Sequence, residues 1–417
     1  MSSGRFSNNI NTYRMVVEGF DWGPGVTALI IDLDDEVVDA SEINTEDFSV
    51  SVLHQKKGTS NYCYERCPVK VAYASDANGN KVLVAASYIT IQLEVSPHIG
   101  NPFTSDEQLS ANNWSRPYQH IITYKEVEFI PTRTGNIMPL TDLFDTTGCF
   151  TSSDGEMLQY AVYSPSAVGK YPLIIWLHGL GEGSIGGAAP PEVALLGNRV
   201  TALVDDEIQG LMGGAHVLVP QAGTFWLDDG TPEANRQMTT TGYSRYERAL
   251  TELLEQFMTK NPAIDTDRIY ISGCSNGGFM TLRMLFLKPD LFAGAIPICH
   301  GYHKDWITEA EIVAIKHIPI WIVHAKNDNT LRYEVTSQSL HDRLIAAGAK
   351  HAYLTLYDNI KDQSGLYVDE AGNPHEYDGH LSWIPVFNNA TKMKINGNVI
   401  SIFAWLASRS RNKTKTY

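Results

Sequence analysis

The chain has 417 residues, 43% of them hydrophobic and 19% charged, and its formal net charge is −15. The length exceeds the ~100–200 residues of a typical domain, so we expect two domains. The negative charge repels nucleic acid, and no apolar run approaches the ~18–20 residues of a membrane-spanning helix. The sequence therefore predicts no nucleic-acid partner and no membrane span.

The cysteines and the N-terminus bear on the compartment. The five cysteines are an odd, sparse set rather than a disulfide framework, and only Cys63 and Cys67 are close enough in sequence to pair in an oxidising compartment. No second cysteine pair completes a zinc site, so we expect no metal. The N-terminal segment lacks the apolar core of a signal peptide, so the compartment stays open: cytoplasmic for the chain as given, or secreted if a leader has been removed.

Residues 1–135 have the pattern of a β domain. Apolar and polar residues alternate over 27–33 and 89–95, and further strands are expected at 48–53, 81–85 and 120–129, separated by turn signals. Several short strands without a convincing helix predict an immunoglobulin-like β-sandwich. The segment 132–148 is polar and has no clear periodicity, so we expect the domain boundary there.

Residues 149–417 have a different character, because short apolar segments now alternate with helical patterns. This alternation predicts an α/β domain, with a mostly parallel sheet covered by helices on both faces. The expected strands are 157–163, 173–177, 216–219, 268–272, 293–298, 319–324 and 352–357. The expected helices are 246–257, 281–287, 337–347 and 402–407.

Residues 273–277, Gly-Cys-Ser-Asn-Gly, form the pattern G-x-S-x-G with Ser275 at its centre. The pattern follows a β-rich run and precedes a helical one, which is the context that a nucleophile elbow requires. In such an elbow the serine occupies a strained turn, and side chains two residues away would clash with neighbouring backbone. We therefore expect Ser275 to be a nucleophile, with the N-terminus of the next helix directed at the developing negative charge.

An acid and a histidine follow the serine in this order in such sites. Asp328 comes shortly after the buried strand expected at 319–324, at the sheet edge where catalytic groups gather. His380 lies in a loop before the last expected helix. We expect Asp328 to orient His380, and His380 to act as the base. The rivals are Asp358 and Asp305 for the acid and His375 for the base.

An oxyanion hole needs two backbone N–H groups near the charged oxygen. The first should come from Asn276, the residue after the nucleophile. The second should come from the loop that follows the strand expected at 173–177, where Leu180 comes directly after His178-Gly. His178 itself is expected to brace this loop rather than to act as a second base.

Two further patterns resemble cofactor sites, but their surroundings argue against that interpretation. Residues 375–380 imitate a zinc-protease motif, yet the spacing is wrong by one residue, and Pro374 and Gly379 disfavour a helix. Residues 181–186 satisfy G-x-G-x-x-G, yet the prolines at 190–191 break the helix that a dinucleotide phosphate needs. We therefore expect no metal and no organic cofactor.

Five segments of the chain resemble those of a known group of enzymes. They are 178–182, Pro220-Gln221 with Trp226, 273–278, 321–328 and 379–383. They are similar to bacterial esterases with an N-terminal immunoglobulin-like domain, in the polyhydroxybutyrate-depolymerase-like and predicted-peptidase branch of the α/β-hydrolases. The resemblance implies an α/β-hydrolase fold and hydrolysis of short-chain carboxylic esters, with a small-molecule ester as substrate and no cofactor.

The expected reaction is acyl transfer in two steps. His380 takes the proton of Ser275 as the hydroxyl attacks the ester carbonyl, and the N–H groups of Asn276 and Leu180 bind the oxyanion. Water then hydrolyses the acyl-enzyme. Three aromatic residues are candidate walls of the substrate pocket, although core packing explains them equally well: Trp226, Trp383 and Phe279.

Other functions remain open on the sequence alone. The same residues suit a serine peptidase, or an acetyl or feruloyl esterase whose β domain helps to present a polysaccharide. A binding protein with a relic elbow is the non-enzymatic alternative. The long polar segment 359–377 is a candidate flap or pocket wall. Acyl specificity and the oligomeric state are not determined, so a homo-oligomer stays open.

Overall fold

The computed structural model describes residues 10–56, 59, 61–106, 111–184, 189–231, 242–365, 367–369 and 371–411. The chain divides into two compact units, Met1–Leu143 and Phe144–Tyr417. The division lies within the segment that the sequence leaves between the two expected domains. Within the described ranges, no helix is long and apolar enough to cross a membrane.

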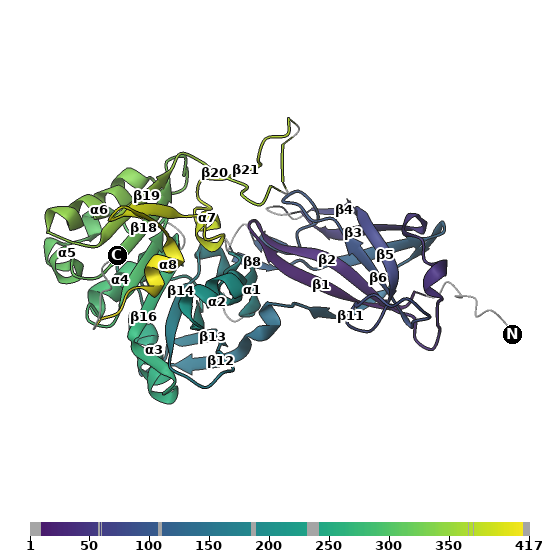
Figure 1. The fold of residues 1–417 in the computed structure, drawn as a ribbon, viewed down its shortest axis with the longest axis horizontal. Coiled ribbons are helices and arrows are strands. Elements are labelled where there is room, and N and C mark those ends of the chain that lie inside the picture. Colours follow the sequence, from purple (N-terminus) through teal and green to yellow (C-terminus); the bar gives the residue numbers. More distant parts are fainter. Residues whose placement is uncertain are drawn as a thin grey trace. The chain divides into compact units, whose positions relative to one another are not determined.

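The first unit is a β-sandwich (Figure 1). Its larger sheet has the strand order β11-β1-β2-β6-β5, its smaller sheet has the order β10-β9-β3-β4, and β7 and β8 form a separate hairpin. Pairing is antiparallel except between β1 and β11, which run parallel. The strands are β1 (Thr12–Phe20), β2 (Gly23–Asp32), β3 (Phe48–Gln55), β4 (Tyr62–Cys67), β5 (Val69–Ser75), β6 (Tyr88–Leu93), β7 (Phe103–Asp106), β8 (Ala111–Trp114), β9 (Tyr118–Tyr124), β10 (Val127–Phe129) and β11 (Thr132–Ile137).

The two sheets of this unit enclose a core because alternate residues of each strand point inward. In β3, for example, Phe48, Val50, Val52 and His54 are buried while the residues between them are more exposed. Within the core, the Tyr13 hydroxyl of the larger sheet lies 3.0 Å from His120 Nδ1 of the smaller sheet. Burial, with a smaller effect of Arg133, lowers the pKa of His120 to about 3, so this polar contact across the sandwich is uncharged.

Two strands expected in this unit are wrong. Residues 81–85 form no strand, because the chain turns around Asp76 and leaves Leu83 and Val84 exposed. Lys81 and Ala86 form isolated bridges only. The strand expected at 120–129 is a hairpin of β9 and β10. Lys125 and Glu126 have φ values of 47° and 70°, which suit a two-residue turn.

The second unit is built on a sheet of eight strands in the order β12-β13-β15-β14-β16-β17-β18-β19. The strands from β15 to β19 along this order pair in parallel, and β12 and β13 are antiparallel additions at one edge. Their bounds are β12 (Asp145–Thr151), β13 (Met157–Tyr163), β14 (Tyr171–Leu177), β15 (His216–Ala222), β16 (Ile264–Cys274), β17 (Gly294–Ile298), β18 (Ile320–Ala325) and β19 (Ala352–Tyr357). Two small hairpins are β20 (Ile360–Lys361) with β21 (Glu376–Tyr377), and β22 (Lys392–Ile395) with β23 (Asn398–Ser401).

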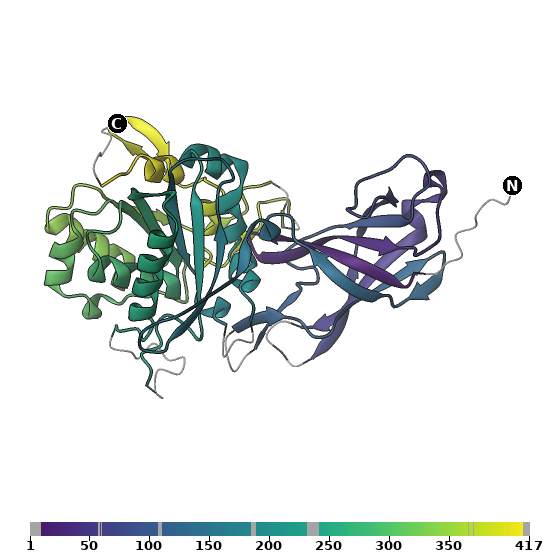
Figure 2. The ribbon, with the colours of Figure 1, turned by 90° about the horizontal axis from the view of Figure 1, so that it is seen from below.

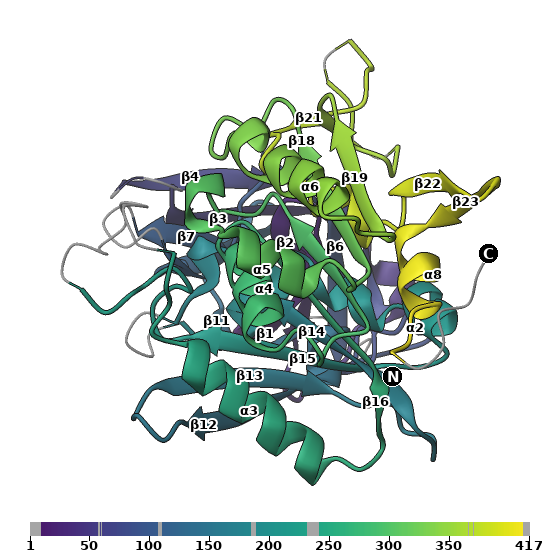
Figure 3. The same cartoon turned by 90° about the vertical axis from the view of Figure 1, so that its left-hand side faces the viewer.

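Helices cover both faces of this sheet (Figures 2 and 3). They are α1 (Glu192–Leu196), α2 (Asp206–Met212), α3 (Glu247–Lys260), α4 (Asn276–Leu287), α5 (Glu309–Ile315), α6 (Ser337–Ala346), α7 (Ile384–Phe387) and α8 (Ile402–Ala407). On one face, Leu173, Ile175 and Leu177 of β14 share a core with apolar residues of α3, α4, α5 and α6. On the other face, Ile174 and Trp176 lie with residues of α7 and α8.

The burial pattern explains why the central strands have the sequences they do. All six residues of β18 are buried, because a parallel strand covered on both faces needs apolar side chains in both directions. Helix α3 buries one stripe that includes Leu250, Leu253, Leu254 and Phe257. The predicted fold class, an immunoglobulin-like sandwich followed by an α/β unit with a mostly parallel sheet, is confirmed.

Candidate active site

Ser275 lies at the turn between β16 and α4, as the G-x-S-x-G pattern predicts. Its φ of 54° and ψ of −113° are strained for a residue with a side chain. A Cβ on Gly277 would lie 1.9 Å from the carbonyl oxygen of Leu177, and one on Gly273 would lie 2.7 Å from the same atom. Both glycines are therefore needed because the end of β14 passes directly against the turn.

The turn is held from its other side by the end of β17 and by the loop that follows it. The Ser275 N–H donates to the Ile298 carbonyl at 2.9 Å, and the Gly301 N–H donates to the Ser275 carbonyl at 2.9 Å. Ser275 remains 9% exposed, whereas Cys274 before it is fully buried. These bonds fix the strained backbone and leave a small part of Ser275 exposed at the carboxyl edge of the sheet.

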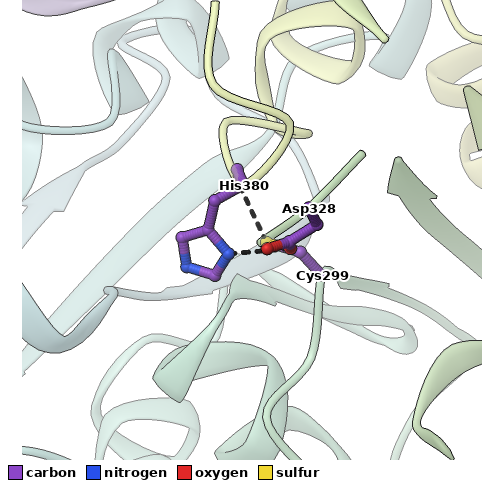
Figure 4. A group of neighbouring side chains, drawn as sticks. All are labelled: Cys299, Asp328 and His380. Carbon is purple, nitrogen blue, oxygen red and sulfur yellow. Dashed lines mark hydrogen bonds and ion pairs between the residues drawn. The ribbon is translucent and has the colours of Figure 1, made fainter. Parts of the chain in front are cut away.

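Asp328 and His380 come together beside this turn, at the edge where the parallel strands end. Asp328 follows β18, and His380 lies in the loop before α7. His380 Nδ1 donates to Asp328 Oδ2 at 2.8 Å (Figure 4). The Asp328 side chain is fully buried, while that of His380 is 17% exposed. Since β16, β17 and β18 are neighbours in the sheet, their following residues meet at one edge.

The Asp328 carboxylate is held in its charged form. Burial opposes the charge, but hydrogen bonds from His324 and His380 outweigh it, and the pKa of Asp328 lies well below its usual range. The backbone N–H groups of Thr330 and Leu331 also donate to Oδ1, at 2.8 and 2.9 Å. This carboxylate therefore supplies a fixed negative charge beside His380.

The His380 loop is fixed by several contacts of its own. The His380 N–H donates to Asp378 Oδ1 at 2.8 Å, and the Cys299 thiol donates to the His380 carbonyl at 3.3 Å (Figure 4). Gly379 lies so close to Asn327 that a Cβ there would come within 2.3 Å of Asn327 Oδ1. The loop therefore packs directly on the turn that carries Asp328.

The rival residues lie in other surroundings. Asp358 is 85% exposed and pairs with Lys326, and Asp305 is 72% exposed beside His303. His375 stacks edge-on against Tyr377. Asp358 and Asp305 are thus exposed side chains paired with other residues, whereas Asp328 is a buried carboxylate that His380 contacts.

The two expected oxyanion donors have suitable positions. The N–H of Asn276 begins α4, and that of Leu180 begins a single turn of 3₁₀ helix, Leu180–Glu182. Neither N–H has a hydrogen-bond acceptor among the residues that the structure describes. The close approach of Gly277 to the carbonyls of Leu177 and His178 brings this loop against the turn of Ser275.

His178 braces the loop, as expected. Its Nε2 accepts the Ala222 N–H at 3.0 Å, so the proton is on Nδ1, which donates to the Gly179 carbonyl at 2.6 Å. Burial lowers the pKa of His178 to about 4, so the ring is neutral. Gln221 adds a bond to the Glu182 carbonyl at 2.9 Å.

The three candidate pocket aromatics differ in position. Trp226 and Phe279 are fully buried members of the core cluster, and Trp226 also donates its backbone N–H to Asn276 Oδ1 at 2.6 Å. Both rings therefore pack in the core, and their role as pocket walls stays a prediction. Trp383, at 8% exposure, is the one of the three whose ring contacts His380, edge-on at 6.3 Å.

The patterns that resemble metal and nucleotide sites lie in different parts of the second unit. Among the described residues, one group could hold a cation: Cys299, Asp328 and His380, whose ligand atoms lie within 4.8 Å of one another (Figure 4). Asp328 and His380 already bond to each other there. Residues 185–188, which complete the G-x-G-x-x-G pattern, lie outside the described residues, and so do residues 366 and 370 of the candidate flap.

Two residues at this site were not singled out from the sequence. His324 is fully buried and lies beside Asp328, and the Cys299 thiol contacts the His380 loop. Both lie at or just after the carboxyl end of a buried strand, in β18 and after β17. That position is the signal that marks them, because side chains at this edge surround the reacting groups.

Comparison with known proteins agrees with this geometry. Residues 12–139 match the family described as esterase Ig-like N-terminal domain, and residues 159–363 match the phospholipase/carboxylesterase family. The chain therefore carries an esterase Ig-like N-terminal domain followed by a phospholipase/carboxylesterase-family domain. The predicted resemblance is thereby confirmed at the level of the two domains.

Individual relatives are more distant. The chain is 27% identical over 204 residues to the bifunctional acetylxylan esterase/xylanase XynS20E of Neocallimastix patriciarum, covering 48% of this chain and 26% of that protein. It is 49% identical over 47 residues to poly(3-hydroxyalkanoate) depolymerase C of Paucimonas lemoignei, 11% of each. The chain thus spans about a quarter or less of the length of these curated relatives.

Among solved structures, a thermostable esterase matches with a TM-score of 0.71 at 23% identity, over 95% of this chain and 99% of that one. At this identity the likeness concerns the fold. It extends through both units, so the order of an Ig-like unit and a hydrolase unit recurs in that protein.

The close approach at Gly277 gives a first prediction. Gly277→Ala should destabilise the fold by about 3 kcal/mol or more, because the new Cβ meets backbone that cannot move aside. Gly210→Ala in α2 is the matched control, since nothing lies within 4 Å of its Cβ and it should gain about 0.5–1 kcal/mol. Urea unfolding measures both, and equal stability of the two variants would contradict the contact with Leu177.

The Asp328 carboxylate gives a second prediction. Because its pKa is below the ordinary 3.8, ionised Asp328 stabilises the fold above that pH, and this stabilisation is lost as the pH falls below it. The gap in urea midpoint between wild type and Asp328→Asn should therefore stay constant above about pH 5 and narrow below about pH 4. The control Asp358→Asn, 85% exposed, should stay near wild type throughout. A gap independent of pH would show that the carboxylate is not held ionised.

Proposed function

We propose that this protein hydrolyses short-chain carboxylic esters through an acyl-enzyme on Ser275. The observation that carries the proposal is the hydrogen bond between His380 and buried Asp328, beside a serine held in a strained turn. Because the Nδ1 N–H of His380 donates a hydrogen bond to Asp328, Nε2 is left unprotonated and can act as the base. The family match of residues 159–363 supports carboxylic ester hydrolysis as the reaction class.

The first step forms the acyl-enzyme. His380 Nε2 takes the Ser275 hydroxyl proton while the Ser275 oxygen attacks the ester carbonyl, and Asp328 stabilises the imidazolium that results. The N–H groups of Asn276 and Leu180 stabilise the oxyanion, with the positive end of the α4 dipole behind them. His380 then gives its proton to the departing alcohol. Water repeats the sequence and releases the acid.

Trp383 is the aromatic residue we propose for the substrate-binding wall. Its ring lies edge-on to that of His380, so an acyl or alcohol group bound next to the base would contact it. The substrate is a small ester, and the proposed reaction needs no metal or organic cofactor. A homo-oligomer and a flap formed by residues 359–377 remain predictions.

Ser275→Ala should lower kcat on p-nitrophenyl acetate and butyrate by at least about 10³-fold, with the fold unchanged. Ser272→Ala is the matched control. It removes a hydroxyl that donates to the Ile296 carbonyl from β16, the strand that precedes Ser275, and it should keep activity close to wild type. Activity on p-nitrophenyl octanoate should be lower than on the short esters. An active Ser275→Ala variant would exclude the acyl-enzyme on this residue.

The alternatives are separated by substrate. A serine peptidase would cleave a peptide p-nitroanilide better than the ester of the same acyl group, and an enzyme acting on polysaccharide would prefer acetylated xylan to p-nitrophenyl acetate. The match to an acetylxylan esterase/xylanase makes acetylated xylan the second substrate to test. Absence of turnover on the whole panel would favour a binding protein with a relic elbow.

A further inference from the structure

The Asp328 carboxylate is shared by two histidines, and only one of them faces the proposed nucleophile. Oδ2 accepts from His380 Nδ1 at 2.8 Å and lies 2.9 Å from His324 Nε2. The His324 side chain has no exposed surface, whereas His380 is 17% exposed. The two rings thus approach the same oxygen, one from the buried side and one from the side of the active site.

The protonation of His324 follows from its neighbours. Nε2 lies within hydrogen-bond distance of Asp328 Oδ2 and of the Leu331 carbonyl, at 3.0 Å. Both are acceptors, so Nε2 carries a proton and donates to both. Nδ1 lies 2.7 Å from Ser337 Oγ, at the start of α6. The ring is therefore fixed at both nitrogens.

These bonds close the turn that carries Asp328. Leu331 donates its N–H to Asp328 Oδ1 at 2.9 Å and offers its carbonyl to His324. Thr330 supplies a further bond to Oδ1. Among the described residues, the carboxylate accepts four hydrogen bonds. Two of them reach Oδ1, and the two that reach Oδ2 come from His324 and His380.

We propose that His324 is a positioning residue of the hydrolase, which holds Asp328 Oδ2 in place and shares its charge with His380. The inference rests on the proposed function of Ser275 and His380. Without His324, the buried Oδ2 would lose one of its two donors, and the carboxylate would be freer to rotate away from His380. With His324 in place, the Asp328 carboxylate keeps one orientation. The His324 N–H also offsets part of the negative charge that would otherwise act on His380.

The groups around His324 leave Asp328 as its charged partner. His300 lies nearby, but burial first, and the proximity of His324 second, lower the pKa of His300 to about 3, so it is neutral. Tyr333 approaches the His324 ring edge-on at 6.5 Å. Cys299 is a protonated thiol because burial and then the Asp328 charge raise its pKa. Around His380, Asp378 binds the backbone N–H rather than the ring.

The test compares His324→Leu with His324→Gln, which keeps an N–H donor within reach of Asp328. In His324→Leu, kcat on p-nitrophenyl acetate should fall about 10–100-fold. Losses of this size are typical when a residue that orients a metal ligand by a hydrogen bond is removed, and His324 orients Asp328 in the same way. KM should change less than about twofold, and His324→Gln should recover most of kcat. The acid limb of the kcat profile should move to higher pH in His324→Leu, because the whole Asp328 charge then acts on His380.

The matched control is His216, at the start of β15. It is also a buried histidine whose Nδ1 lies 3.0 Å from a serine hydroxyl, that of Ser164, at the opposite end of the strand from the site. His216→Leu should leave kcat and the acid limb unchanged. If His324→Leu behaves like His216→Leu, or if His324→Gln loses as much kcat as His324→Leu with an unmoved acid limb, His324 is only structural and the inference is wrong.

A second measurement does not depend on turnover or on the full loss of the ring. In Ser275→Ala, the downfield NMR resonance of the proton between His380 and Asp328 should shift when Ser337→Ala is added, since that change releases His324 Nδ1 while keeping the ring. A resonance unchanged by Ser337→Ala and by His324→Leu would overturn the inference. If no ester is hydrolysed, the proposed function fails, and this resonance still decides the role of His324.

Discussion

The carbonyl oxygen of Leu177 lies where a side chain on Gly277 would have to be, and the whole site is arranged around that contact. It brings the end of β14 against the turn between β16 and α4, so the loop after β14, which carries the proposed donor Leu180, meets the turn of Ser275. Ser275 can keep its strained φ only because hydrogen bonds to Ile298 and Gly301 hold the turn from the other side. The strain is thus distributed between three neighbouring strands.

The electrostatics of the site follow from burial. Cys299, His178 and His300 are all buried, and desolvation keeps each of them uncharged. Asp328 is equally buried, yet hydrogen bonds from two rings and two backbone N–H groups keep it ionised. A buried permanent charge acts strongly on what it faces, because little water screens it. In this site it faces His380.

Much of this arrangement could be predicted from the sequence, because the signals are local. The strand, the glycines and the helix around Ser275 are contiguous, and the alternation of apolar segments with helical patterns determines the parallel sheet. The fold class therefore followed from residues near one another in the chain.

What could not be predicted depends on distant contacts. Residues 81–85 have the composition of a strand but no partner strand, and β9 and β10 were merged because Lys125 and Glu126 carry no glycine signal for their turn. Trp226 and Phe279 were ambiguous because composition does not show which face of the sheet a ring lies on. The contact of His324 with Asp328 needs the turn geometry after β18, which no periodicity shows.

The two histidines on Asp328 differ in a way that suits their positions. His324 is bonded at both ring nitrogens and has no exposed surface, so its conformational freedom was lost on folding. His380 is bonded at Nδ1 and reaches solvent, and its loop is fixed by Cys299 and Asp378 through backbone atoms rather than through the ring. In the proposed mechanism, a ring that moves a proton between Ser275 and a leaving alcohol needs small rotations, whereas its acid must stay still. His324, the immobile ring, contacts Asp328 Oδ2 from the buried side, and His380, the less constrained ring, contacts the same oxygen from the more exposed side. One oxygen atom can therefore be held still by His324 while it orients His380.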